Sequence, residues 1–173
     1  MFASIMKSST TEDAQIFESK GGNTIIVVTN GKYEMQRYHD VSEFPAVNYT
    51  HKPIGNFPVP IFQALWNKAA IAVSRDVTKI NYQGVNFDGD FAATDNRRVS
   101  IALGEKKYEG DPILLMPNIG KIIKNCKNAI TLGVSENGKQ VIVDCPEIGM
   151  IASIRMIDAK FPPYQQFIDG KED

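Results

Sequence analysis

The sequence predicts an α+β fold made of a repeated unit, with helices on one face and antiparallel sheet on the other. Two observations support this prediction. Short runs of β-branched and aromatic residues alternate with turn pairs such as Asp88-Gly89 and Asn137-Gly138. The chain also matches itself when it is shifted along its own length, so one pattern of helix and strands recurs.

Three segments have the periodicity of an amphipathic helix: residues 1–8, 60–75 and 117–128. The second and third begin with Pro60 and Pro117, and proline is well suited to the first turn of a helix. The apolar side chains of these two segments fall on one helical face, which is typical of a helix that covers a sheet.

Six segments have the composition of β-strands, because they are rich in β-branched and aromatic residues and are bounded by turn residues. They are residues 22–30, 32–39, 80–87, 129–135, 139–145 and 149–157. The stretch FAATDNRRVSIA, residues 91–102, adds a hairpin, since two short runs of small and apolar residues flank the turn pair Asp95-Asn96. Together these segments predict sheets of short strands joined by tight turns.

The internal repeat defines the unit from which the fold is built. A shift of 117 residues lays residues 1–47 on residues 118–164, so that Phe44 falls on Phe161. A second shift, of 57 residues, lays the helix that follows Pro60 on the later helix. The unit is therefore a strand, a helix and three strands.

The same repeat predicts the domain organisation. Residues 1–50 would form the C-terminal half of a first domain, residues 51–168 a complete central domain with two units, and residues 169–173 a linker or tail. Half a domain leaves apolar side chains without cover and a sheet edge open to pairing. We therefore expect residues 1–50 to be less stable than the central domain, or to be covered by a second chain through self-association.

The composition is that of an ordinary soluble globular protein. The chain has 173 residues and a formal net charge of −1, with 43% hydrophobic and 23% charged residues. No apolar run approaches the length that crosses a bilayer, and the apolar stretch at the N-terminus is too short for a signal peptide. We therefore expect a cytoplasmic protein that has no membrane partner.

Positive charge is concentrated on the three predicted helices, which contain no Asp or Glu. Lysine is common on exposed helix faces because it is a good helix former, but glutamate would then be equally common. The absence of acids from all three helices favours a positive surface that matches phosphates. The basic residues assigned to this surface are Lys7, Lys68, Arg75, Lys121 and Lys124.

No catalytic constellation stands out. Glycine-rich phosphate loops, zinc-binding motifs and nucleophile elbows are absent, and neither histidine is placed to act as a base. Cys126 and Cys145 lack the spacing of metal ligands, so each is expected to be a buried thiol. Asp88, Asp90 and Asp95 fit polar turns better than a cation site, because no further oxygen ligands follow at loop spacing. We expect a protein that is not an enzyme and needs no metal or cofactor.

Three motifs together identify a family that this chain resembles. They are FAATDNRRVSIA (91–102), ILLMPNIGKIIKN (113–125) and DAKFPPYQQFI (158–168). In order and spacing they are similar to the hairpin V-A-T-D-G-H-R-L-A, the strand-Pro-helix segment and the domain exit G-R-F-P-D-Y-R-R-V of the bacterial sliding clamp, the β subunit of DNA polymerase III. The match covers residues 56–168 and 1–50, and it implies the DNA-clamp fold.

The resemblance implies a DNA polymerase processivity factor, or a fragment of one. In that family the helices line the inner surface of a ring around duplex DNA, and the strands form the outer sheets. The basic helix surface would then face DNA. An alternative is a clamp-fold interaction module that does not engage DNA, and an enzyme of another fold is a more distant third possibility.

The resemblance also implies a groove that binds linear peptide motifs of DNA polymerase and clamp-loader subunits, with Gln and Leu or Phe anchors. In the family, the hairpin and the exit segment form one wall of this groove. Carried over position by position, the groove residues are Tyr82, from the strand before the hairpin, and Thr94, Asn96, Arg97, Arg98, Val99, Pro162, Gln166 and Phe167.

This chain departs from the family pattern at several of these positions. Asn96 stands where the family has Gly, and asparagine still tolerates a left-handed turn. Arg97 replaces a His, Gln166 an Arg, and Phe167 a smaller aliphatic residue. Asn118 stands where a basic residue usually follows the proline that starts the helix. We therefore expect a different peptide preference and the loss of one DNA contact.

Overall fold

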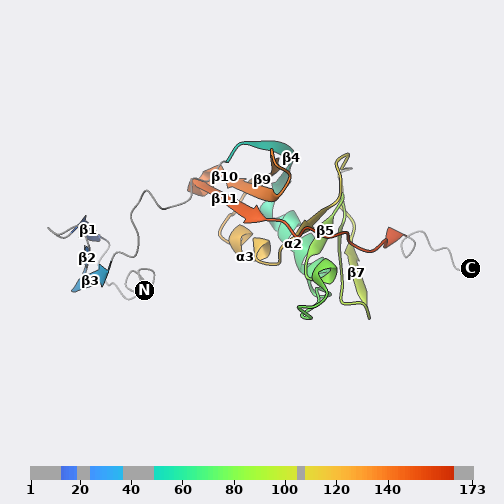
Figure 1. Ribbon diagram of the computed structural model, residues 1–173. Coiled ribbons are helices and arrows are strands. Elements are labelled where there is room, and N and C mark those ends of the chain that lie inside the picture. Colours follow the sequence, from blue (N-terminus) through green and yellow to red (C-terminus); the bar gives the residue numbers. More distant parts are fainter. Residues whose placement is uncertain (1–12, 19–23, 37–48, 105–107, 166–173) are drawn as a thin grey trace, which may run out of the picture. The chain divides into compact units, whose positions relative to one another are not determined.

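The computed structural model describes residues 13–18, 24–36, 49–104 and 108–165. The chain divides into two compact units, Met1–Ala46 and Val47–Asp173 (Figure 1). The helix predicted for the N-terminus lies outside the described residues. In the described part of the chain, no helix is long and apolar enough to cross a membrane.

The first unit contains a three-stranded antiparallel sheet in the order β1-β2-β3. Its strands are β1 (Gln15–Glu18), β2 (Thr24–Val28) and β3 (Lys32–Gln36). Val27 is fully buried, whereas Ile16 and Phe17 of β1 are exposed. A shift of 117 residues places all three strands on the last three strands of the second unit, so the repeat seen in the sequence is also structural.

The second unit contains two four-stranded antiparallel sheets, with two α-helices and two 3-10 helices among its described residues. In chain order its elements are β4 (His51–Pro58), α2 (Val59–Ala70), η2 (Ile80–Tyr82), β5 (Val85–Phe87), β6 (Phe91–Thr94), β7 (Val99–Ala102), β8 (Ile113–Leu115), α3 (Ile119–Ile123), β9 (Ala129–Ser135), β10 (Gln140–Cys145), η3 (Pro146–Ile148) and β11 (Met150–Arg155). These elements form two copies of the predicted strand-helix-three-strand unit, and the predicted fold class is confirmed.

Each copy gives its first strand to the sheet of the other copy. β4 pairs with β9, which makes one sheet β11-β10-β9-β4, and β8 pairs with β5, which makes the other sheet β7-β6-β5-β8. The helices α2 and α3 lie side by side (Figure 1), and Nε2 of Gln63 donates to the carbonyl of Ile123 at 3.2 Å. Neither copy can therefore complete its sheet alone.

Both helices are shorter than the sequence predicts. The segment predicted as helix over 60–75 ends at Ala70, because the chain then turns and the amide of Ser74 donates to the carbonyl of Tyr82 at 2.8 Å. The segment predicted as helix over 117–128 keeps α-helical geometry only in α3. Beyond it, the amide of Cys126 bonds the carbonyl of Ile123, three residues back, which tightens the chain into a 3-10 turn.

The strand predicted over residues 80–87 is wrong in its first half. The amide of Gln83 donates to the carbonyl of Ile80 at 3.2 Å, and this local bond forms the 3-10 helix η2 in place of a strand. Only β5 pairs in the sheet. Strand propensity depends on cross-strand neighbours, and residues 80–82 have none in the β5 ladder.

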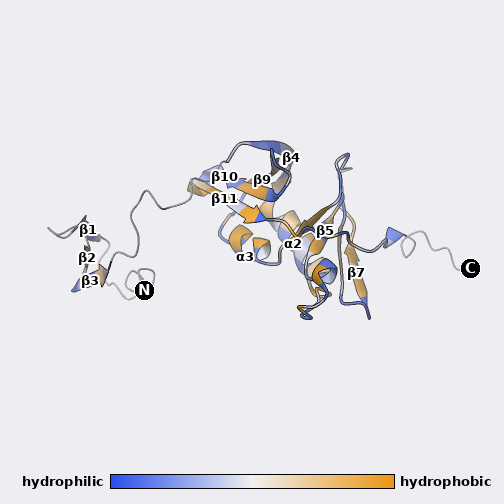
Figure 2. Cartoon of the chain, viewed as in Figure 1, coloured by the Kyte–Doolittle hydropathy of each residue, from blue (hydrophilic) through white to orange (hydrophobic). Residues whose placement is uncertain are grey.

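An aromatic cluster holds α2 against the sheet β7-β6-β5-β8. Phe62 and Trp66 of α2 stack with their ring centroids 5.8 Å apart, and Phe91 of β6 meets Phe62 edge-on at 5.1 Å. Phe87 of β5 continues the cluster at 5.0 Å from Phe91. Figure 2 shows that apolar residues also predominate in α3 and β7. The contacts between the aromatic rings add to the stabilisation that comes from burying each ring.

Cys126 and Cys145 are buried free thiols, as predicted. The sequence did not predict that they meet. Burial, and then a hydrogen bond with Cys145, raises the pKa of Cys126 to about 12. Cys126 is therefore a protonated thiol at neutral pH and behaves as a small apolar side chain of the core.

After β11 the chain crosses the face of the sheet β7-β6-β5-β8 that is opposite α2. The amide of Ile157 donates to the carbonyl of Leu114 at 3.0 Å, and the hydroxyl of Tyr164 donates to Oδ1 of Asp88 at 2.6 Å. Tyr164 also bonds Asn86. The neighbouring Phe87 is on the α2 side of the sheet, because it packs against Phe91, which contacts Phe62 of α2; Asn86 therefore points to the opposite face. Burial, and then the bond to Asp88, raises the pKa of Tyr164 above its ordinary value.

Gly120 of α3 lies against Trp66 of α2. A Cβ atom at Gly120 would clash with the indole Nε1 of Trp66. Replacing a helical glycine by alanine ordinarily stabilises a helix by up to about 1 kcal/mol. Here we expect Gly120→Ala to lower the free energy of unfolding by about 1–3 kcal/mol, because the core is overpacked. Denaturant unfolding measures this. The exposed neighbour provides the control, since Lys121→Ala should change stability by less than about 0.5 kcal/mol. A Gly120→Ala variant as stable as the wild type would contradict the close approach.

The Tyr164–Asp88 bond should hold the exit segment, residues 157–165, on the sheet. Tyr164→Phe removes the hydroxyl donor and should destabilise this segment locally by about 1–3 kcal/mol, since the half-buried carboxylate of Asp88 loses its shortest hydrogen bond. Hydrogen exchange at the amide of Ile157 measures the effect as faster exchange. Tyr49→Phe is the matched control, because Tyr49 is 44% exposed. Equal exchange at Ile157 in both variants would show that the bond does not anchor the segment.

Candidate functional site

The candidate site is centred on the turn between β6 and β7. Oδ1 of Asp95 accepts hydrogen bonds from the amides of Arg97 and Arg98 at 3.0 and 3.1 Å, and Oδ2 accepts one from Nε of Arg98 at 3.0 Å. The bond from the Arg97 amide is the main cause that holds the pKa of Asp95 below its ordinary value. Asn96 has φ 75°, the left-handed conformation that asparagine tolerates. The side chain of Arg98 therefore helps to close the turn, whereas Arg97 contributes only its backbone amide.

Hydrogen bonds join several of the predicted groove residues into one network. The hydroxyl of Thr94 donates to the carbonyl of Arg98 at 2.8 Å, and the amide of Asn96 donates to Oγ1 of Thr94 at 3.1 Å. Tyr82 donates its hydroxyl to Oδ1 of Asn96 at 3.3 Å. Tyr82 lies in the 3-10 helix η2, not in a strand as predicted from the sequence. Even so, the structure brings it to the turn.

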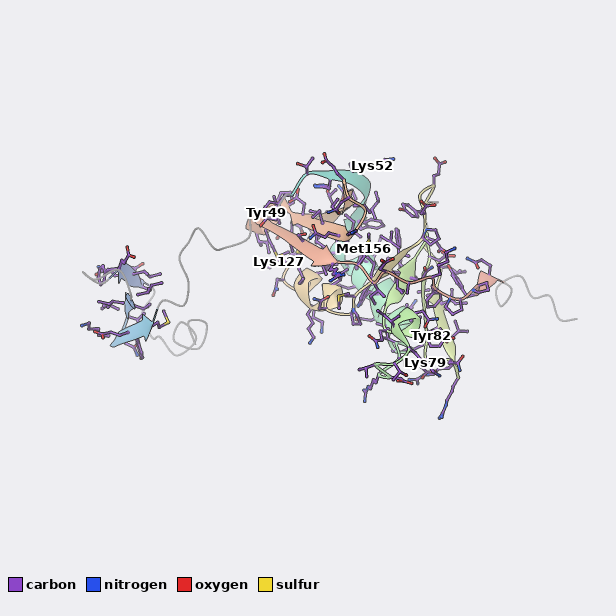
Figure 3. The ribbon with its side chains drawn as sticks, viewed as in Figure 1. Tyr49, Lys52, Lys79, Tyr82, Lys127 and Met156 are labelled. Carbon is purple, nitrogen blue, oxygen red and sulfur yellow. The ribbon has the colours of Figure 1, made fainter. Side chains whose placement is uncertain are left out.

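Lys79 adds a cation that the sequence analysis did not assign to the site. Its ammonium group lies 5.9 Å from the centroid of the Tyr82 ring. Figure 3 shows both residues together in the segment that follows α2. The charge pattern of the sequence could not identify Lys79, because only the fold of residues 74–82 places it beside the hairpin turn.

Val99 belongs to the apolar part of the site. Ser100, its neighbour on β7, donates its hydroxyl to the carbonyl of Lys68 on α2 at 2.6 Å, so Ser100 faces the helix. Because side chains alternate along a strand, Val99 and Ile101 lie on the opposite face. Val99 is 36% exposed and Ile101 is half-buried. The exit segment crosses this same face of the sheet.

Pro162 lies on that face, nearer to the other end of β6. It lines a cavity of about 520 Å³ together with Asn86, Leu114 and Tyr164. The cavity adjoins Asp88 in the turn before β6, whereas the turn at Asp95 follows β6. Gln166 and Phe167 lie outside the described residues, so their place in the groove stays a prediction.

The aspartates near the hairpin are used by donors of the protein itself. Asp88 accepts from Tyr164 and from Nε2 of Gln165, the latter at 3.2 Å, and Asp90 accepts from the amide of Gly104 at 2.7 Å. Within the described ranges, no group of three or more His, Cys, Asp or Glu residues could hold a metal ion. These carboxylates act as turn and anchor residues.

The predicted basic surface is exposed where the structure describes it. The exposed basic residues are Lys68, Arg75, Lys121 and Lys124. Lys7 lies outside the described residues. Lys68 and Lys121 stand in the last turns of their helices, where the helix dipole favours a cation. That effect explains the two positions, but it does not explain why α2 and α3 carry no acid anywhere along their length.

Comparison with known proteins shows which solved structures share this architecture. No protein-family model matches the chain, and no curated protein matches it. Solved structures do match. The β subunit of DNA polymerase III from Thermotoga maritima is similar with a TM-score of 0.76 and 17% sequence identity, over 95% of this chain and 47% of that chain.

Two further clamps give the same result. The DnaN sliding clamp from Bartonella birtlesii, whose structure contains bound griselimycin, has a TM-score of 0.77 and 13% identity, over 95% of this chain and 48% of that chain. The β subunit from Pseudomonas aeruginosa has a TM-score of 0.74 and 12% identity, over 99% and 50%. The chain spans about half the length of these clamps. Similarity at such low identity establishes the fold alone, and this chain has the fold of the bacterial sliding clamps.

Proposed function

We propose that the chain is a DNA polymerase processivity factor, or part of one, that docks peptide motifs of polymerase and clamp-loader subunits and holds duplex DNA. The observation that most supports this proposal is the hydrogen-bonded turn between β6 and β7, which stands where the sequence motif predicts the peptide groove. The proposed role is that of an accessory subunit, in which binding and positioning replace catalysis.

In this proposal the peptide lies on the face of the sheet opposite α2, beside the exit segment. Val99 and Ile101 accept apolar side chains of the peptide, because both lie on that face and neither is fully buried. Arg97 and Arg98 supply hydrogen-bond donors at one end of the site. The apolar contacts provide most of the affinity, and the polar contacts fix the register of the peptide.

The proposed DNA surface is formed by the exposed basic residues of α2, α3 and the segments that follow them. Cations without base-reading partners bind phosphates independently of sequence, and this suits a protein that moves along DNA. Encircling DNA requires a closed ring, so holding DNA in this way also requires association with further clamp subunits. The contact itself then needs little affinity.

A clamp-fold interaction module that does not engage DNA is the alternative. Ile71 favours it, because this side chain is 67% exposed at the C-terminal end of α2, among the residues proposed to face phosphates. Protein–DNA interfaces are usually polar and positively charged, so an exposed isoleucine fits such an interface poorly. The two proposals differ in whether duplex DNA binds with a dependence on salt.

Val99 provides the test of peptide docking. Val99→Glu places a charge on the apolar surface and should weaken binding of a synthetic peptide with Gln and Leu or Phe anchors by at least about tenfold. Fluorescence polarisation measures the affinity, and circular dichroism verifies the fold. Ile71→Glu is the matched control, because Ile71 is exposed but lies off the site. Equal peptide affinity in wild type and Val99→Glu would show that the peptide does not bind at the proposed groove.

Lys121 and Lys124 provide the test of DNA association. If both contact phosphates, replacing both by alanine should lower the slope of log affinity against log salt by roughly two units. Lys139, in the turn between β9 and β10, and Arg155, at the end of β11, are exposed basic residues away from the helices, and their double alanine variant serves as the control. An unchanged slope in the helix variant would refute the DNA surface. Wild-type protein that shows no salt-sensitive duplex binding would favour the interaction module.

A further inference from the structure

We propose that the partner peptide carries acidic side chains next to its apolar anchors, and that Arg97 selects for them. This inference rests on the proposed docking of peptides at the turn between β6 and β7. It concerns the charge of the residues beside the anchors, which neither the fold nor the sequence motif specifies.

The two arginines of the turn are in different electrostatic states. Arg98 donates from Nε to Asp95, so the single carboxylate of the turn is already paired. Arg97 uses its backbone amide for the same carboxylate, but its guanidinium has no ion-pair partner among the residues that the structure describes. It is exposed to solvent. An external carboxylate can therefore bind Arg97 without displacing a partner within the described structure.

One further cation and one carboxylate lie close to this turn. Lys79 is brought to the turn through Tyr82, which bonds Asn96. Asp76 lies in the same loop, but its carboxylate accepts from the amide of Thr78 at 3.0 Å and from the hydroxyl of Thr78 at 2.7 Å. These bonds hold the pKa of Asp76 below its ordinary value, and its carboxylate also attracts the ammonium group of Lys79. Arg97 is therefore the cation of this end that is left for an external carboxylate, and Lys79 is a second, partly compensated one.

Exposed apolar side chains around these cations favour a peptide over a nucleic acid. Val99 is 36% exposed, and Ile80 and Val77 of the loop are 54% and 83% exposed. A phosphate backbone offers nothing to such side chains, whereas a peptide with both apolar and acidic residues matches both features. Guanidinium groups also pair with carboxylates in a planar, two-bond geometry that lysine cannot form.

The identity of residue 97 makes this selection particular to this chain. The hairpin pattern that the sequence resembles has histidine at this position, and histidine is largely neutral at pH 7. Arginine stays charged at every physiological pH. The replacement adds a permanent positive charge beside the apolar floor. The expected partner therefore differs from a peptide defined by its Gln, Leu and Phe anchors alone.

The experiment compares two synthetic peptides with identical anchors, one flanked by two Asp residues and the other by two Asn residues. For the wild-type chain at low ionic strength, we expect the Asp peptide to bind about three- to tenfold more tightly. The preference should disappear in Arg97→Gln and should be largely screened in about 0.5 M salt. In Arg97→Glu it should reverse in favour of a Lys-flanked peptide. Arg155→Gln, which removes an exposed arginine elsewhere, should leave the preference unchanged.

The outcomes separate this inference from the proposed function. If both peptides bind the wild type equally, the acidic preference is wrong and the docking site remains. If neither peptide binds, the docking site is wrong and the inference is overturned with it. If Arg97→Gln keeps the Asp preference but weakens duplex DNA binding, Arg97 belongs to a nucleic-acid surface and the inference is also overturned.

Discussion

The pairing of β4 with β9 and of β8 with β5 is the constraint on which the second unit depends. Each strand-helix-three-strand copy lacks one strand of its own sheet and receives it from the other copy. A copy on its own would expose the unpaired backbone of a sheet edge and the apolar faces of its helix. Completing either sheet therefore requires both copies, and the buried core combines residues of both, such as Phe62 and Phe91 of the first copy with Ile119 and Leu132 of the second.

The candidate site depends on this exchange. The hairpin of β6 and β7 belongs to the first copy, but the strand that completes its sheet, β8, begins the second copy. The segment that covers its outer face follows β11, at the end of the second copy. Bonds from Ile157 to Leu114 and from Tyr164 to Asp88 hold that segment in place. The face of the sheet on which Val99 lies is therefore partly covered, at β5 and β8, by residues far from the hairpin in sequence.

Within the hairpin, local chemistry separates two adjacent arginines. The carboxylate of Asp95 accepts three bonds and fixes the turn, and in doing so it pairs with Arg98. Arg97 bonds this carboxylate through its backbone amide only, and within the described residues its guanidinium has no ion-pair partner. A turn that is stable by itself thus carries a permanent charge that it does not use. Such a charge, next to exposed apolar side chains, gives the surface a chemical preference that is separate from the stability of the fold.

The sequence by itself determined the features that depend on short-range chemistry. Strand β9 matches its predicted range of 129–135, the hairpin around Asp95 forms as predicted, and the proline at the start of α2 lies where it should. The repeat predicted the strand-helix-three-strand units, because the same spacing of apolar residues recurs in each copy. Alternation, turn pairs and helix starts are all set by residues close together in the chain.

Only the tertiary structure decided where elements end and which distant groups meet. The helix predicted to continue to residue 75 stops at Ala70 because the amide of Ser74 bonds Tyr82, and residues 80–82 form a 3-10 turn in place of a strand. The place of Lys79 beside the site follows from that same loop. Exchange of first strands and the anchoring of Tyr164 on Asp88 likewise join residues far apart in sequence. Periodicity along the chain contains no information about such bonds, because their energy depends on partners that only the folded chain brings together.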